Sequence, residues 1–265
     1  MTFVGRSLPR LEDGALLAGT GCFAADVSFA QQIHMRVVRS PYAHAKILSI
    51  ATGAASAATG VVAVWSADDV SDIPPIDFRV GRIEQLEPYR QPILAKDRVR
   101  YVGEPVAVVF ATDPYLAEDA AELVALKVEE LRVLVDADAE PHAFDVSQTT
   151  TIASVRKEYG DVDAAFAMAH AVVALDLSIG RHSGVPLETR GAVAHFDAAL
   201  DILTLYGAAK VPHANRNALA RMLGREPTSI HLREGHVGGG FGASAVNSIP
   251  RTFSPASVQC VLGGR

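Results

Sequence analysis

The chain has 265 residues and a mass of 28.0 kDa, which is enough for one large domain or two ordinary ones. Hydrophobic residues make up 49% and charged residues 20%, and this balance excludes wholesale disorder. The net charge of −6 and the pI near 5.8 argue against nucleic-acid binding through a basic surface.

Signals for export, membrane insertion and disulfide formation are also missing from the sequence. No apolar run approaches the ~20 residues of a membrane-spanning helix, and residues 1–14 lack the apolar stretch of a signal peptide. The two cysteines, Cys22 and Cys260, are too few for a disulfide framework or a cysteine-rich metal site. We therefore expect a soluble, cytoplasmic protein with a mixed α/β (α+β) fold.

The first half of the sequence predicts strands and helices in alternation. A helix is expected after Asp113, which suits the N-cap position, with Pro114 in the first helical turn. This helix belongs to a strand–helix–strand unit over residues 104–135. Strands are expected, from their apolar and β-branched runs, at residues 33–39, 60–65, 104–110 and 125–135.

A polar stretch without periodicity, residues 136–151, is the best domain boundary. Beyond it, helices are expected over 161–169 and 214–223, and the second should end at Gly224 in the C′ position. Further strands are expected at residues 171–179, 191–196, 202–206 and 229–232.

The sharpest local feature is a glycine cluster that follows the last expected strand. It reads Val237-Gly238-Gly239-Gly240-Phe241-Gly242, and we call it the glycine loop. Glycine permits φ > 0 and a close approach of the backbone to a ligand, and successive N–H groups in such a turn can converge on an anion. The spacing differs from the dinucleotide fingerprint, and no Lys-Ser/Thr pair follows to make a P-loop. Taken alone, the cluster is either a plain turn or a ligand-binding loop.

Six motifs follow one another along residues 5–243. They are Gly5-Arg6 with Arg10-Leu11-Glu12-Asp13 and Gly19-Thr20-Gly21; Arg39-Ser40-Pro41-Tyr42-Ala43-His44-Ala45; Val99-Arg100-Tyr101-Val102-Gly103-Glu104-Pro105-Val106-Ala107; Ala117-Glu118-Asp119-Ala120-Ala121; Pro186-Leu187-Glu188-Thr189-Arg190-Gly191; and the glycine loop. In this order they resemble the N-terminal part of the molybdopterin-binding large subunit of the xanthine dehydrogenase, aldehyde oxidase and carbon-monoxide dehydrogenase family.

The resemblance implies a domain organisation. The segments are an N-terminal extension at 1–14, an a/b hammerhead domain at 15–138, a linker at 139–150, a truncated first part of the molybdopterin-binding domain at 151–243, and a tail outside the family at 244–265.

The resemblance also implies roles for the glycine loop. In the family this loop lies against the molybdenum centre, where its backbone approaches the apical oxo ligand and its Phe lines the substrate pocket. By motif match these roles fall on Gly239, Gly240, Phe241 and Gly242. Many relatives carry a Gln that reaches the molybdenum ligands where this chain has Lys210, which is either a donor to the cofactor or a surface lysine. No protein ligand to a metal and no catalytic residue is expected, because the family's catalytic glutamate lies far towards the C-terminus.

Other polar residues are given structural interpretations. In the family the motif around Glu188 is chiefly structural, and Arg39 and His44 are expected to brace the hammerhead fold. Four histidines are the candidates for a metal site, but no pair of them has the H-x-x-x-H spacing. They are expected to be surface or core histidines. They are His182, His195, His213 and His236.

The function implied is that of an oxidoreductase fragment. The family oxidises an aldehyde, an N-heterocycle or carbon monoxide with oxygen taken from water, and it uses molybdenum–molybdopterin, either plain or as the cytosine dinucleotide. FAD and [2Fe-2S] clusters are expected only on partner subunits, because this chain has no iron–sulfur cysteine pattern. We expect the chain alone to be catalytically incomplete.

Two alternatives remain open at this point. One is a non-catalytic folded remnant, or a module that binds partner subunits without a cofactor. The other is an independent nucleotide-binding module, which the spacing of the glycine loop disfavours.

The tail after Ala243 has no family counterpart as written, and we expect a shift of reading frame there. With permitted codon choices, reading one base back from Ser244 gives Arg-Gly-Glu-Leu-Tyr-Pro-Glu-Asp-Phe-Leu, which resembles the relatives directly after this loop. Residues 244–265 should then be poorly packed. Sequencing the gene around the codon for Ser244 tests this expectation.

Overall fold

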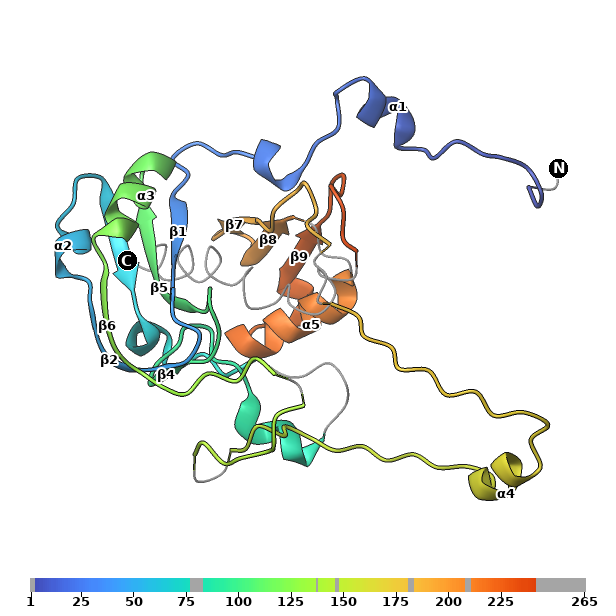
Figure 1. Ribbon diagram of the computed structural model, residues 1–265. Coiled ribbons are helices and arrows are strands. Elements are labelled where there is room, and N and C mark those ends of the chain that lie inside the picture. Colours follow the sequence, from blue (N-terminus) through green and yellow to red (C-terminus); the bar gives the residue numbers. More distant parts are fainter. Residues whose placement is uncertain are drawn as a thin grey trace.

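The computed structural model describes residues 3–76, 83–136, 138–145, 148–180, 184–207 and 211–241. Within these ranges the chain forms three sheets of three strands each, together with helices (Figure 1). The strands are β1 His34–Arg39, β2 Ala45–Ala51, β3 Val61–Trp65, β4 Arg98–Val99, β5 Pro105–Ala111, β6 Ala125–Glu130, β7 Val193–Asp197, β8 Ile202–Tyr206 and β9 Ile230–Arg233. The α-helices are α1 Asp13–Leu17, α2 Gly53–Ser56, α3 Pro114–Glu122, α4 Val162–Ala167 and α5 Pro212–Leu223, and the 3-10 turns are η1 Ala24–Asp26, η2 Ala67–Val70, η3 Glu84–Tyr89 and η4 Pro227–Ser229. The expected mixed α/β fold is confirmed.

The first sheet has β5 at its centre, with β1 and β3 paired antiparallel to it on either side. All seven residues of β5 are buried, as expected for an apolar run in a central strand. Phe110 of β5 meets the ring of Trp65 edge to face at a centroid distance of 5.0 Å. This strand therefore forms the core of the first half of the molecule.

The expected N-cap of α3 is confirmed, because the carboxylate of Asp113 accepts hydrogen bonds from the backbone N–H groups of Tyr115 (2.8 Å) and Leu116 (3.3 Å). The helix buries Ala117 and Ala120, and its main contacts are with β1 and β5. The following strand, β6, does not pair with β5. It joins a second sheet of order β4-β2-β6, so the two strands of the expected strand–helix–strand unit lie in different sheets.

Strand β2 is the longest of the elements in the first half that the sequence pattern missed, which also include α1, α2 and β4. Its burial alternates only weakly, and Lys46 and Ser49 interrupt its apolar residues. Pairing with both β4 and β6 makes it the central strand of its sheet. Its strand conformation thus comes from its neighbours rather than from its own sequence.

Two of the family-like motifs, 39–45 and 99–107, lie against each other. The backbone N–H of Ser40 donates to the carbonyl of Glu104 (3.0 Å), and the N–H of Gly103 donates back to the carbonyl of Ser40 (2.8 Å). The guanidinium of Arg39 donates to the carbonyl of Gly103 (2.9 Å). His44 is bonded through Nδ1 to the carbonyl of Arg132 (2.7 Å). Both residues that we expected to brace this part of the fold thus make bracing contacts within it.

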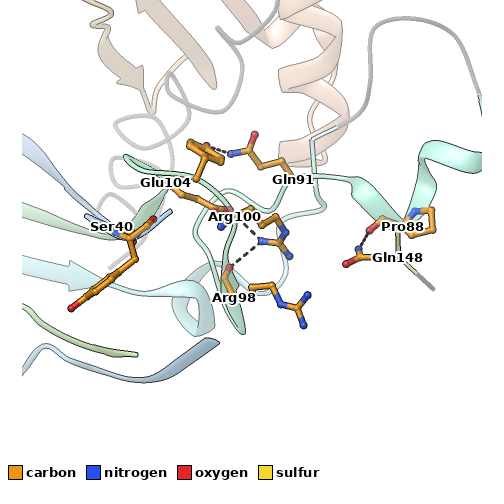
Figure 2. Close-up of polar contacts among 9 residues, drawn as sticks. Ser40, Pro88, Gln91, Arg98, Arg100, Glu104 and Gln148 are labelled. Carbon is orange, nitrogen blue, oxygen red and sulfur yellow. Dashed lines mark hydrogen bonds and ion pairs between the residues drawn. The ribbon is translucent and has the colours of Figure 1, made fainter. Parts of the chain in front are cut away.

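The carboxylate of Glu104 is a buried charge in this cluster. It accepts a hydrogen bond from the backbone N–H of Arg100 (2.5 Å) and a second from the Arg100 guanidinium (3.2 Å), which Figure 2 shows pointing at it. The Glu104 side chain is 1% exposed, and burial raises its pKa above the ordinary value of 4.5 in spite of these bonds.

This raised pKa predicts a pH dependence of stability. The folded state binds the Glu104 proton more tightly than the unfolded state does, so the contribution of this group is fully present below pH 4.5 and is lost as the pH rises through the raised pKa. The stability of the wild type relative to Glu104→Gln should therefore fall between pH 4 and pH 7. Urea unfolding of both proteins across this range measures the difference. A difference that is constant or rises with pH would contradict the prediction.

The second half contains the sheet β7-β8-β9, in which β7 and β8 are antiparallel and β8 and β9 are parallel. Helix α5 packs on it and ends at Gly224, which takes φ +62°, so the expected C′ glycine is confirmed. This core also contacts partly buried apolar residues of the first half, namely Ile73, Ile76 and Ile93. The residues at its centre are Leu203, Leu205, Leu219, Met222 and Ile230.

The strand expected at 171–179 is wrong. In Figure 1 residues 151–180 run away from the two halves as an extended arm, with α4 as the helix expected near 161–169. Residues 171–179 are extended but form no ladder with any described residue, and Leu175, Leu177 and Ile179 are exposed. A strand needs a neighbouring edge to bond its N–H and C=O groups, and the described residues offer none here.

None of the helices within the described ranges has both the length and the apolar character required to cross a bilayer.

Candidate functional site

The glycine loop leaves β9 in a conformation that requires glycine at one position. Gly239 takes φ +109°, far from the range of residues with a side chain, and Phe241 takes φ +42°, in the left-handed region. The positive angles thus lie on either side of Gly240. Gly242 lies outside the described residues.

The loop packs closely on residues 184–188, which include the first three residues of the 186–191 motif. A Cβ atom placed on Gly238 would lie 2.4 Å from Cβ of Glu188, and one placed on Gly184 would lie 2.7 Å from Cβ of Phe241. A Cβ on Gly239 would come within 2.9 Å of the Phe241 ring and 3.2 Å of Pro186. These approaches are possible only because glycines stand at the contact points.

Glu188 joins the loop to the N-terminal part of the chain. Its carboxylate accepts a hydrogen bond from the backbone N–H of Gly238 (2.7 Å) and another from the N–H of Ala24 (3.3 Å). Its own N–H donates to the carbonyl of Gly238 (3.2 Å). Three segments that are far apart in sequence therefore meet at one side chain.

A second junction, which joins two of these three segments, lies beside it. The N–H of His236 donates to the carbonyl of Cys22 (2.8 Å), and the N–H of Cys22 donates to Nδ1 of His236 (2.9 Å). The Phe23 ring lies tilted against the His236 ring, with centroids 6.1 Å apart. His236 therefore has a structural role, as expected of the histidines, although sequence reasoning did not identify its partner.

Beyond Gly238 the loop presents backbone donors. Within the described part of the chain, the N–H groups of Gly239, Gly240 and Phe241 make no hydrogen bond. Successive unpaired N–H groups of a glycine turn suit an anionic oxygen, as in phosphate-binding nests. The donor set therefore fits an anionic oxo or phosphate group of a cofactor.

The other site candidates are distributed as follows. Lys210 and His182 lie outside the described residues. His195 stacks on Phe29 at a centroid distance of 4.8 Å, which is a packing contact. Among the described residues, no group of three or more His, Cys, Asp or Glu side chains could hold a metal ion.

A cleft of about 1750 Å³ opens next to the loop, between β1 of the first half and the segment leading into β7. Its walls include His34 and Arg36 of β1, Glu188 and His195 from the segment leading into β7 and from β7 itself, and Gly238 of the loop. The loop thus stands where the two halves of the molecule face each other.

The sequence did not predict the contacts of Ala24 and Glu188 with the loop, nor those of Cys22 with His236 just before it. The identities of residues 22–24 do not indicate a contact, because these residues form these hydrogen bonds through backbone atoms. The order of the motifs was the available signal, since it placed the 186–191 motif and the glycine loop in one domain.

Comparison with known proteins gives two matches that divide the chain. Residues 18–132 match the family described as aldehyde oxidase and xanthine dehydrogenase, a/b hammerhead domain. Residues 144–262 match the molybdopterin cofactor-binding domain, and this match runs past Ala243 into the tail.

Individual relatives agree with these matches. The chain is 39% identical over 248 residues to the gamma subunit of the 6-hydroxypseudooxynicotine dehydrogenase complex of Paenarthrobacter nicotinovorans, covering 91% of this chain and 31% of that subunit. Among solved structures it is similar to CO dehydrogenase from Oligotropha carboxidovorans, with a TM-score of 0.83 and 32% identity over 98% of this chain and 34% of that one. Quinoline 2-oxidoreductase from Pseudomonas putida 86 gives a TM-score of 0.79 and 31% identity over 98% and 33%. The chain spans about a third of the length of these relatives.

Proposed function

Since the chain belongs to the family of molybdopterin-binding large subunits that includes xanthine dehydrogenase, aldehyde oxidase and CO dehydrogenase, we propose that it supplies the first cofactor-binding loop of a molybdenum hydroxylase. The reaction class is the oxidation of an aldehyde, an N-heterocycle or carbon monoxide, with oxygen taken from water. The observation that carries the proposal is the glycine loop, whose N–H groups from Gly239 to Phe241 have no partner among the described residues.

The residues that would hold the cofactor are those of the loop. Gly239, Gly240 and Phe241 offer adjacent N–H donors, and Gly242 and Lys210 complete the proposed set from outside the described residues. When bound, molybdenum–molybdopterin supplies the redox centre and the site of oxygen transfer. The chain's own part is to orient anionic groups through backbone donors that are already fixed, which costs no reorganisation on binding. The exposed Phe241 ring is proposed to line the substrate pocket.

The domains are proposed to follow the boundaries expected from the sequence: an extension at 1–14, a hammerhead domain at 15–138, a linker at 139–150, part of the molybdopterin-binding domain at 151–243, and a tail at 244–265. The three buried apolar clusters formed by the strands of the first half support an independent core there.

This division predicts unequal local stability. Amides of β5 should exchange with solvent far more slowly than those of residues 171–179, because the latter make no strand ladder. Hydrogen exchange followed by mass spectrometry measures both segments in one experiment. Equal protection of the two would contradict the absence of a strand ladder over residues 171–179.

Partner subunits are part of the proposal. The gamma subunit from Paenarthrobacter nicotinovorans is, by its name, a member of a dehydrogenase complex. We propose that partners of this chain carry FAD and [2Fe-2S] clusters, and that the molybdopterin is present either plain or as the cytosine dinucleotide. A cytoplasmic location remains a prediction from composition.

Metal analysis tests the function. The purified chain is incubated with isolated molybdenum cofactor and passed through a gel-filtration column, and molybdenum and pterin are then measured for each chain. Retention of about one molybdenum per chain is the expected result. Absence of molybdenum would favour a non-catalytic remnant or a partner-binding module, and tight binding of nucleotide without molybdenum would favour a nucleotide-binding module.

A further inference from the structure

We propose that Glu188 is a positioning residue, which fixes the glycine loop for the cofactor by joining it to residues 22–24. The inference rests on the proposed function, because it assigns a role towards the same cofactor. It concerns a residue for which the sequence suggested only a general structural part.

The carboxylate of Glu188 bonds two separate segments of the chain. Its two oxygens are used separately, Oε2 by Gly238 at 2.7 Å and Oε1 by Ala24 at 3.3 Å. Glu188 is half-buried, so water competes only partly for these oxygens. Hydrogen bonds from backbone N–H to a carboxylate are stronger than those between neutral groups.

Gly238 is held by Glu188 through both of its backbone polar groups. Its N–H donates to the Glu188 side chain, and its carbonyl accepts the Glu188 N–H at 3.2 Å. With both polar groups of Gly238 bonded to one residue, the peptide plane that leads into Gly239 has little freedom. The unpaired donors begin at this next residue, so Glu188 sets the direction in which they point.

The segment of residues 22–24 anchors the carboxylate on its other side. Residues 22–24 are themselves bonded to the segment between β9 and the loop, because Cys22 and His236 exchange two hydrogen bonds. A Cβ on Gly235 would lie 2.5 Å from the carbonyl oxygen of Cys22, so the backbones of these two segments are in direct contact. Glu188 therefore ties the loop to a segment that is already fixed at its base, which is how a binding loop is preorganised.

The experiment compares Glu188→Gln and Glu188→Ala with the wild-type chain of 265 residues. Glutamine keeps the shape but replaces one acceptor oxygen with an N–H donor, so one of the two bonds is lost. Alanine removes both. Glu226→Gln is the matched control, because Glu226 is an exposed glutamate at the turn after α5, away from the loop.

The first measurement is amide exchange in the chain without cofactor. In Glu188→Gln the amide exchange rate of either Gly238 or Ala24 should rise about 10- to 100-fold. In Glu188→Ala the exchange rates of both amides should rise. ¹⁵N relaxation should show faster local motion at Gly239 and Gly240, while the melting temperature and the exchange of β5 stay at wild-type values. A residue that contributes only to overall stability would move the melting temperature and β5 as well.

The second measurement is molybdenum retained after gel filtration. It should fall about 10-fold or more in Glu188→Gln and should be unchanged in Glu226→Gln. If the wild type retains molybdenum and Glu188→Gln retains as much with unaltered loop amides, the role of Glu188 is wrong and the proposed function stands. If the wild type retains none, the proposed function fails, and with it the role towards the cofactor, whatever the amides show.

Discussion

Gly238→Ala should reduce the molybdenum retained by the chain about 100-fold. The new Cβ would lie 2.4 Å from Cβ of Glu188 and 3.2 Å from its backbone nitrogen. Neither atom belongs to the flexible end of a side chain, so the loop and residues 186–188 must separate. Separation breaks both hydrogen bonds that connect Gly238 and Glu188, which together are worth about 2–4 kcal/mol.

The control for this variant is Gly191→Ala. A Cβ at Gly191 meets no atom within 4 Å and its backbone has no positive φ, so its retention should equal that of the wild type. Gly239→Ala provides a second test, because φ +109° and a contact of 2.9 Å with Phe241 both disfavour a side chain there. Full retention of molybdenum by folded Gly238→Ala would show that the cofactor does not depend on the loop geometry described above.

Phe110→Ala should destabilise the chain by about 3–5 kcal/mol, because it removes the largest fully buried side chain of the central strand β5. The ring is 1% exposed and packs edge to face on Trp65, with Leu94 and Val108 in the same cluster. The cavity that remains cannot be filled, since β5 is fixed between two paired strands.

Chemical unfolding followed by Trp65 fluorescence measures this loss, since Trp65 is the only tryptophan and lies against the mutated site. Val62→Ala on the neighbouring strand β3 is the control, because Val62 is 41% exposed and should change the free energy of unfolding by less than about 1 kcal/mol. A loss below about 1 kcal/mol for Phe110→Ala would mean that β5 is not the core of the first half.

The sequence by itself determined those features whose cause is local. The side chain of Asp113 caps α3 from one position before it, and Gly224 ends α5 through its own left-handed conformation. The apolar run of β5 identified a buried strand without knowledge of its partners. The ordered motifs identified the family, because each motif is a short and specific run of residues that needs no folding to be recognised.

The tertiary structure alone decided which of these elements meet. It placed β5 and β6 in different sheets and left residues 171–179 without a partner among the described residues, because strand pairing depends on edges supplied by distant parts of the chain. It also brought Glu188 to the glycine loop and to Ala24 through backbone N–H groups, which every residue except proline possesses. Backbone contacts between remote segments leave no mark in residue identity, apart from the glycines that permit the close approach.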